Sequence, residues 1–299
     1  MKENQNGKTI KIPNKLRDPF LFEDVIHIQR DLTGDINGLD MSAITFIEPY
    51  SMISVLLMGR NYLRATGNKL RLVNLPVHIH QYLVRMDFFK SGIFEDPEPL
   101  SDKYLLKRSN LSSRVIEIIE IPNKERMSIK VITAVIDIFR KRAEHILKFW
   151  MSDSVIDYFV TVISELCQNI FEHSLDSGFI SMQTYTIGKE NVFRLVISDS
   201  GIGIRESFEN KKNITFNSTA DLIEMALTKP ISSKRDFGFG LCQVNTIVEK
   251  LKGAIYIRSD TGSVTALYNK KKSGSPFMFL KNDLGQFNGT QISISLSSL

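Results

Sequence analysis

The stretch LVISDSGIGI, residues 195–204, places an apolar run directly before a carboxylate and two glycines. The run predicts a buried strand that ends at Asp199, with Gly201 and Gly203 following at alternate positions. A carboxylate at the end of a strand can accept a hydrogen bond from an exocyclic amine, and glycines beside it let the backbone approach a flat ring. The same pattern also fits an ordinary glycine-rich turn, in which Asp199 is a local turn residue.

Upstream of this stretch, apolar periodicity predicts two long helices, at residues 128–149 and 153–175. The second helix carries Glu165, Asn169 and His173 at intervals of four residues, which puts the three side chains on one face. The carbonyl oxygen of an asparagine flanked by a carboxylate can hold a hard divalent cation. The alternative is that these residues form only the solvent-facing side of an amphipathic helix.

Downstream lies a basic, glycine-rich segment, SSKRDFGFGL, residues 232–241. Gly238 and Gly240 lead into a predicted helix, and such an entry offers backbone N–H groups and the positive end of the helix dipole to an anion. Lys234 and Arg235 add positive charge that suits a lid over phosphate groups. The alternative is a flexible surface loop before a helix.

The rest of the second half of the sequence is predicted to form mainly strands. Helices followed by a run of strands predict an α+β sandwich, with helices on one face of a mixed sheet. A polar segment, residues 205–236, separates the strands into two groups. The predicted strands are residues 113–122, 180–187, 192–199, 253–260, 263–269 and 289–296.

The first hundred residues alternate strand-like and helix-like patterns, which predicts a smaller α/β domain. A polar stretch with two prolines, residues 91–104, reads as a linker. We therefore predict domains at residues 1–102 and 103–299. In the first domain, strands are predicted at 24–32, 42–48 and 69–75, and helices at 50–67 and 76–89.

Four elements thus occur in order: a helix with Glu165 and Asn169, a strand ending in Asp-x-Gly-x-Gly, a basic lid with Gly-x-Gly-Leu, and a strand opened by Gly289 and Thr290. Together they resemble the ATP-binding domain of the GHKL superfamily, which includes gyrase, Hsp90-type chaperones, histidine kinases, MutL and anti-sigma-factor serine kinases. The resemblance covers about residues 105–299. One departure is a stretch before Gly289, residues 264–288, which reads as an inserted hairpin.

The resemblance implies a role for each position. Asn169 would coordinate a Mg²⁺ ion that bridges the phosphates, and Glu165 would orient or deprotonate the attacking group. Asp199 would accept a hydrogen bond from the adenine amine with support from Thr290, and the glycine pair Gly201 and Gly203 would make room for the base. The lid and the helix entry would hold the phosphates through Lys234, Arg235, Gly238, Gly240 and Leu241.

Residues 38–89 resemble a STAS domain, the fold of anti-sigma-factor antagonists, in their order of strand, turn, long helix, strand and short helix. In that family, a turn at the start of the long helix carries a serine or threonine that a partner GHKL kinase phosphorylates. Here the turn reads Glu48-Pro49-Tyr50-Ser51. The usual acceptor is missing, which argues against regulatory phosphorylation of this domain, with only Ser51 or Tyr50 as substitutes.

Composition narrows the classes of function. The chain has 299 residues, is 42% hydrophobic and 24% charged, and carries a net charge of +5, as a folded soluble protein does. No basic stripe is interleaved with aromatic residues, so we expect no direct binding of nucleic acid. The N-terminus has no apolar core and the most apolar window is interrupted, which predicts no membrane segment. Cys167 and Cys242 read as reduced thiols of a cytoplasmic protein.

These features lead to three hypotheses. The first is an Mg–ATP-binding regulatory switch that controls protein partners, such as a STAS protein or a sigma factor. The second is a serine/threonine kinase of the anti-sigma type that acts on a separate protein. The third is an ATPase that forms a homodimer on binding ATP. The sequence leaves open whether ATP is hydrolysed, transferred or only bound.

Overall fold

The computed structural model describes residues 8–32, 34–97, 112, 114–122, 129–149, 151–188, 190–209, 211, 214–233, 240–268 and 277–297. The chain divides into two compact units, Met1–Asn110 and Leu111–Leu299. The predicted boundary between residues 102 and 103 lies in a stretch outside the described residues, so it stays a prediction.

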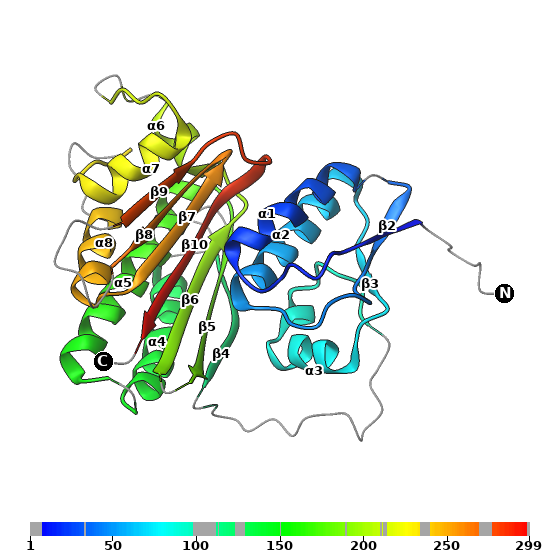
Figure 1. Cartoon of the computed structure of the whole chain (residues 1–299), viewed down its shortest axis with the longest axis horizontal. Helices are drawn as coiled ribbons and strands as arrows, with labels where there is room; N and C mark the ends of the chain where they lie inside the picture. The colour runs from blue at the N-terminus through cyan, green and yellow to red at the C-terminus, as the bar shows by residue number, and fades with distance from the viewer. Residues whose placement is uncertain are drawn as a thin grey trace. The chain divides into compact units, whose positions relative to one another are not determined.

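In its described residues, the second unit is built on a seven-stranded sheet with the order β4-β5-β6-β10-β7-β8-β9 (Figure 1). Hairpins join β5 to β6 and β7 to β8, and β9 pairs with β8 at one edge. The strands are β4 (Val115–Ile121), β5 (Gly178–Ile187), β6 (Glu190–Asp199), β7 (Ala254–Asp260), β8 (Gly262–Leu267), β9 (Phe277–Lys281) and β10 (Phe287–Ser297).

Helices cover one face of this sheet, as Figure 1 shows for α4, α5 and α8. Alternate residues of β6, namely Phe193, Leu195 and Ile197, are buried in the core between the two layers. This confirms the predicted α/β sandwich with helices on one face of the sheet. The helices are α4 (Ile129–Leu147), α5 (Asp153–Asn169), α6 (Gly203–Phe208), α7 (Thr219–Thr228) and α8 (Gly240–Lys250), and α5 continues as a π-helical turn, η4 (Ile170–Ser174).

The expectation of a mixed sheet is wrong, because every strand pairing described in this sheet is antiparallel. The helical connection between β6 and β7 does leave these two strands running in the same direction. However, β10 lies between them and runs opposite to both. The last strand of the chain therefore turns a potential parallel pair into two antiparallel ones.

The first unit has a three-stranded parallel sheet, β1-β2-β3, in its described residues. It is a small α/β unit, as predicted, whereas its likeness to a STAS domain stays a prediction. Its strands are β1 (Lys8–Lys11), β2 (Ile36–Asp40) and β3 (Arg71–Val73). Its helices are α1 (Pro19–Ile26), η1 (His27–Asp31), α2 (Pro49–Thr66), α3 (Val77–Arg85) and η2 (Phe88–Ser91).

Two strands predicted in the first unit are wrong. Residues 24–32 belong to α1 and η1, because Asp18 caps the helix by accepting hydrogen bonds from the N–H groups of Phe20 and Leu21 at 2.9 and 3.0 Å. Residues 42–48 form no strand. The chain turns after β2, where Asp40 Oδ1 accepts from the Ser42 N–H at 2.9 Å.

Residues 48–51, which the sequence compares with the phosphorylated turn of STAS domains, lie at the start of α2. Helix α2 begins at Pro49, and the side chains of Tyr50 and Ser51 are both fully buried. The ring of Tyr50 packs edge-on against Phe22 of α1, with the centroids 5.9 Å apart. Whether this turn is phosphorylated stays a matter of prediction from the sequence.

The polar segment at residues 205–236 contains a helix that the sequence did not predict. Ser218 caps α7 by accepting a hydrogen bond from the Asp221 N–H at 3.1 Å, and Leu222, Ile223 and Leu227 of this helix lie in the core. Within the described ranges, we find no helix with the length and apolar character that crossing a bilayer requires.

Candidate functional site

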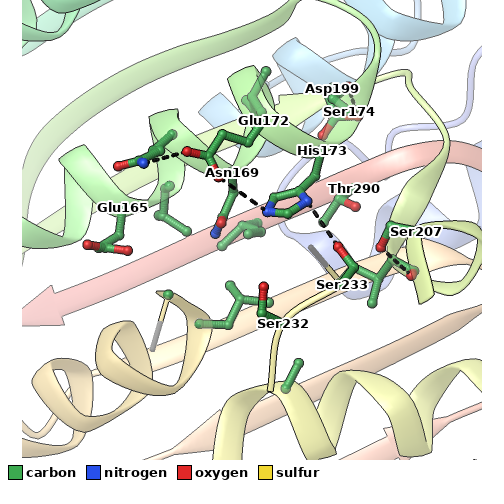
Figure 2. A pocket seen from close by; sticks show the side chains of 18 of the residues that line it. Glu165, Asn169, Glu172, His173, Ser174, Asp199, Ser207, Ser232, Ser233 and Thr290 are labelled. Carbon is green, nitrogen blue, oxygen red and sulfur yellow. Dashed lines mark hydrogen bonds and ion pairs between the residues drawn. The ribbon is translucent and has the colours of Figure 1, made fainter. Parts of the chain in front are cut away.

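A cavity of about 340 Å³ opens between the helix layer and the ends of two strands of the sheet. Its walls come from α5, η4, the end of β6, α6, the segment before α8, the start of α8 and β10 (Figure 2). Most of the residues that the sequence singled out meet here: Glu165, Asn169, Asp199, Gly203, Gly240, Leu241 and Thr290 all line it. Lys234, Arg235 and Gly238 lie outside the described residues.

Asp199 is placed by the register of the sheet. It is the last residue of β6 and pairs with Gly178 of β5, and it shares the helix-facing side of the strand with Leu195 and Ile197. The strand ends where the helix layer leaves a gap, so the carboxylate lies in the wall of the cavity with only 5% of its surface exposed.

Among the described residues, three groups donate hydrogen bonds to this carboxylate. The hydroxyl of Ser174 donates to Asp199 Oδ1 at 2.6 Å, and the N–H of Gly201 donates to the same oxygen at 2.9 Å. The backbone N–H of Thr290 is the third donor. An ionised carboxylate offers about four acceptor positions, so this arrangement leaves one position open for a donor in the cavity.

Burial dominates the electrostatics of Asp199. It raises the pKa of the carboxyl to about 6, and the nearby charge of Asp176 acts in the same direction. The hydrogen bonds from Ser174, Gly201 and Thr290 oppose this rise because they stabilise the ionised form. The group therefore titrates close to neutral pH, as functional carboxyl groups often do.

The two glycines after Asp199 have different roles. A Cβ at Gly201 would overlap the carbonyl oxygen of Ser174, so this glycine lets the η4 turn reach Asp199 and does not line the cavity. The sequence instead predicted that Gly201 makes room for a flat ring. Gly203 does line the cavity, and its φ of +73° is one that favours glycine. A Cβ there would lie 2.8 Å from Ser259 Oγ.

A second polar contact, centred on Ser259, holds β10 near the turn after β6. Ser259 of β7 accepts a hydrogen bond from the Ile204 N–H at 2.8 Å and donates to the Gly289 carbonyl at 2.9 Å. Gly289 has a φ of +82°, and a Cβ there would overlap the Asp199 carbonyl. This packing puts Thr290 beside Asp199 despite the inserted β9 strand that precedes it.

The opposite end of the cavity is formed by α5 and the start of α8. Glu165 and Asn169 point from α5 into the cavity (Figure 2), as their spacing predicted. A Cβ on Gly240, the first residue of α8, would lie 3.3 Å from Asn169 Oδ1 and 3.6 Å from Glu165 Oε2. The N-terminus of α8 therefore faces the carboxylate and amide of α5 at close range.

Several residues of the site were not predicted. The π-helical turn η4 brings Ser174 to Asp199 and sets His173 in the cavity wall, where its Nδ1 hydrogen-bonds with Ser233 Oγ at 3.0 Å (Figure 2). The His173 Nε2 lies 3.8 Å from Glu172 Oε2. Helical spacing had already placed His173 on one face with Glu165 and Asn169. Ser174 and Ser233 were not singled out, because a widened turn carries no simple sequence signal.

A comparison with known protein families matches the part of the chain that forms most of this site. Residues 155–279 match the model of the family described as histidine kinase-, DNA gyrase B-, and HSP90-like ATPase. The match begins in α5 and ends in β9, so it includes the residues that line the cavity except Thr290 and Ile292 of β10. No curated protein sequence matches the chain. Within the second unit, residues 155–279 are therefore similar to the HATPase_c family of ATPases.

Proposed function

We propose that the cavity binds Mg–ATP and that this binding acts as a switch controlling protein partners. One observation carries the proposal. A buried carboxylate with one open acceptor position, Asp199, lies at one end of a single cavity, and the N-terminus of α8 lies at the other end beside Asn169. A ligand with an amine-bearing base and an anionic tail matches both ends.

The base would lie at the Asp199 end. Its exocyclic amine would donate to the open position of the carboxylate, with Gly203 in the cavity wall beside it. The apolar side chains of Ile197, Ile204 and Ile292 supply the flat, water-excluding walls that a base needs.

The phosphates would lie at the α8 end. The free N–H groups and dipole of a helix N-terminus favour anions, and Gly240 allows a close approach. Among the described residues, no group of three or more His, Cys, Asp or Glu side chains could hold a metal ion by itself. A Mg²⁺ ion would therefore take Asn169 Oδ1 together with phosphate oxygens and water, as this cation commonly does with nucleotides.

A switch needs a part of the site that changes its order with the ligand. From the sequence we infer that Mg–ATP orders a lid over residues 205–240 and thereby changes the surface that a partner meets. Residues 234–239 of this segment lie outside the described residues. The small α/β unit in the same chain would dock that partner, for which a STAS protein or a sigma factor is our candidate.

One observation favours a kinase as the alternative. Glu165 lines the cavity beside Gly240, where it could orient or deprotonate an attacking hydroxyl group. When bound, Mg–ATP would supply the phosphoryl group, and transfer requires mainly positioning and neutralisation of charge. The acceptor would be a serine or threonine of another protein, since Ser51 of the first unit is buried.

The fate of the terminal phosphate separates the two functions. We would incubate the chain with Mg–ATP labelled on the γ-phosphate, alone and with a dephosphorylated cell extract, and repeat both with Glu165→Gln. A switch leaves the label on bound ATP in wild type and variant alike. Label on an extract protein that disappears with Glu165→Gln would establish the kinase and refute the pure switch.

A further inference from the structure

The hydroxyl of Ser174 contacts the carboxylate of Asp199, which we propose binds the adenine base. Ser174 is the last residue of the π-helical turn η4, and its side chain is only 5% exposed. It donates to Asp199 Oδ1 at 2.6 Å, a length typical of an O–H group bonded to an ionised carboxylate. Figure 2 shows Ser174 and Asp199 together at one end of the cavity.

Two features hold Ser174 in this position. Its own carbonyl oxygen accepts a hydrogen bond from the Ile202 N–H at 3.1 Å, which ties η4 to the turn after β6. Gly201 has no side chain at the point where a Cβ would overlap the backbone of Ser174. The contact between Ser174 and Asp199 is thus built into the backbone on both sides.

The hydrogen bonds to Asp199 also determine which ligand groups its carboxylate can bind. Oδ1 of Asp199 already accepts hydrogen bonds from both Ser174 and Gly201. While Asp199 is ionised, its remaining open position can only accept a hydrogen bond from a ligand. A protonated carboxyl would instead offer an O–H donor. An ionised Asp199 selects a base with an amine at this point, and a protonated one tolerates a base with a carbonyl oxygen there.

Building on the proposed ATP site, we propose that Ser174 is a positioning residue that fixes Asp199 as an ionised acceptor and thereby makes the cavity prefer adenine over guanine. The preference arises because adenine presents an amine where guanine presents a carbonyl oxygen. The hydroxyl of Ser174 acts through Asp199 and need not touch the nucleotide.

The charged groups around Asp199 support this role. Burial raises the pKa of Asp199 to about 6, the charge of Asp176 raises it as well, and the hydroxyl of Ser174 is the strongest opposing influence. Asp176 comes from the turn after η4 and accepts a hydrogen bond from Ser200 Oγ at 2.7 Å. His173 and Glu172 of η4 are the other titratable groups in this part of the wall.

The test is the pH profile of nucleotide affinity in Ser174→Ala. Loss of the hydroxyl removes a hydrogen bond to a charged group, so the midpoint below which ATP affinity falls should rise by about one pH unit. From ionisation alone, ATP affinity should then decrease about twofold at pH 7 and about fivefold at pH 6 relative to wild type. The ratio of ATP to GTP affinity should decrease in the same pH range.

Two further variants serve as controls. Ser164→Ala removes a serine hydroxyl from α5, the helix that η4 continues. This hydroxyl donates to the Val160 carbonyl at 3.0 Å and does not line the cavity, so the pH profile of this variant should match wild type. Because phosphate groups of the nucleotide also titrate near neutral pH, the midpoint is read as a difference from this control. Ser174→Thr restores a hydroxyl and should return the midpoint toward the wild-type value.

The outcomes separate this inference from the proposed function. If wild-type protein binds no adenine nucleotide, the ATP site itself is wrong. If wild type binds ATP but Ser174→Ala keeps the wild-type midpoint and the wild-type ATP to GTP ratio, only the role of Ser174 is refuted. Should Ser174→Ala fail to fold, Ser174→Cys decides: its weak S–H donor should raise the midpoint in the same direction, and a wild-type midpoint overturns the role of Ser174.

Discussion

Replacing Gly201 with alanine tests how tightly the end of β6 is packed against η4. Gly201 is not in a positive-φ conformation, so the cost of the substitution is steric. The new methyl group would overlap the Ser174 carbonyl, a backbone atom that cannot turn aside as a long side chain can. Either η4 or the turn after β6 must therefore move.

The cost can be worked from the bonds at this point. Such a movement breaks the hydrogen bonds from Ser174 and Gly201 to Asp199, at 2.6 and 2.9 Å, and the bond from Ile202 to Ser174 at 3.1 Å. A bond to a charged group contributes about 1.5–3 kcal/mol and a neutral one about 1 kcal/mol. Allowing for partial relaxation, we expect the free energy of unfolding of the second unit to decrease by about 3–5 kcal/mol.

Thermal unfolding measures this effect. For a unit of this size, about 3–5 kcal/mol corresponds to a decrease in melting temperature of about 6–20 °C. Gly34→Ala is the control, since a Cβ at Gly34 meets no atom within 4 Å and Gly34 has no positive φ. A Gly201→Ala protein that melts within about 2 °C of wild type and still binds ATP would refute this account of the turn.

The other predictions concern pH, the phosphate end and the second polar contact. The pKa of Asp199 is raised to about 6 in the folded state, so the contribution of this carboxyl to the free energy of unfolding is greatest at low pH and is lost as pH rises from about 4 to about 6. The affinity for ATP should increase over the same pH range, and ATP titrations at several pH values check this trend. Gly240→Ala crowds Asn169 and should weaken ATP binding more than adenosine binding, as calorimetry with both ligands would show. Ser259→Ala removes the bonds to Ile204 and Gly289 and should lower the free energy of unfolding by about 1–3 kcal/mol in urea titrations, and a change below about 0.5 kcal/mol would contradict it.

The sequence predicted the parts of the fold that depend on local periodicity. The helix at residues 50–67 appears as α2 and ends at Gly67, whose φ of +74° makes it a typical helix terminator. The apolar run before Asp199 correctly placed this residue at the end of a buried strand, β6. Glu165 and Asn169 share the cavity because helical spacing alone puts them on one face.

The errors arise where capping or distant strands decide the structure. Apolar residues at 24–32 resemble a strand, but the Asp18 cap and the proline after it start a helix. The hydroxyl of Ser218 starts α7 within a segment whose polarity suggested a loop. The insertion of β10 between β6 and β7 depends on pairing across the whole unit, and no local pattern reveals it.

The same distinction applies to the site. Residues in motifs with fixed spacing were found, whereas Ser174 and Ser233 reach the cavity through a π-helical turn and a connecting segment. Gly201 was found, but its role was not, because the atom it makes room for belongs to a residue 27 positions earlier. Such a contact can be read only from the folded chain.

Calorimetric titration of wild-type protein and Asp199→Asn with Mg–ATP tests the central claim most directly. The account predicts that wild type binds ATP at one site per chain and that Asp199→Asn, which exchanges an acceptor oxygen for a donor amide at nearly constant volume, loses most of that affinity while remaining folded. Equal ATP affinity in a folded Asp199→Asn protein, or no binding by wild type, would contradict the assignment of this cavity to ATP.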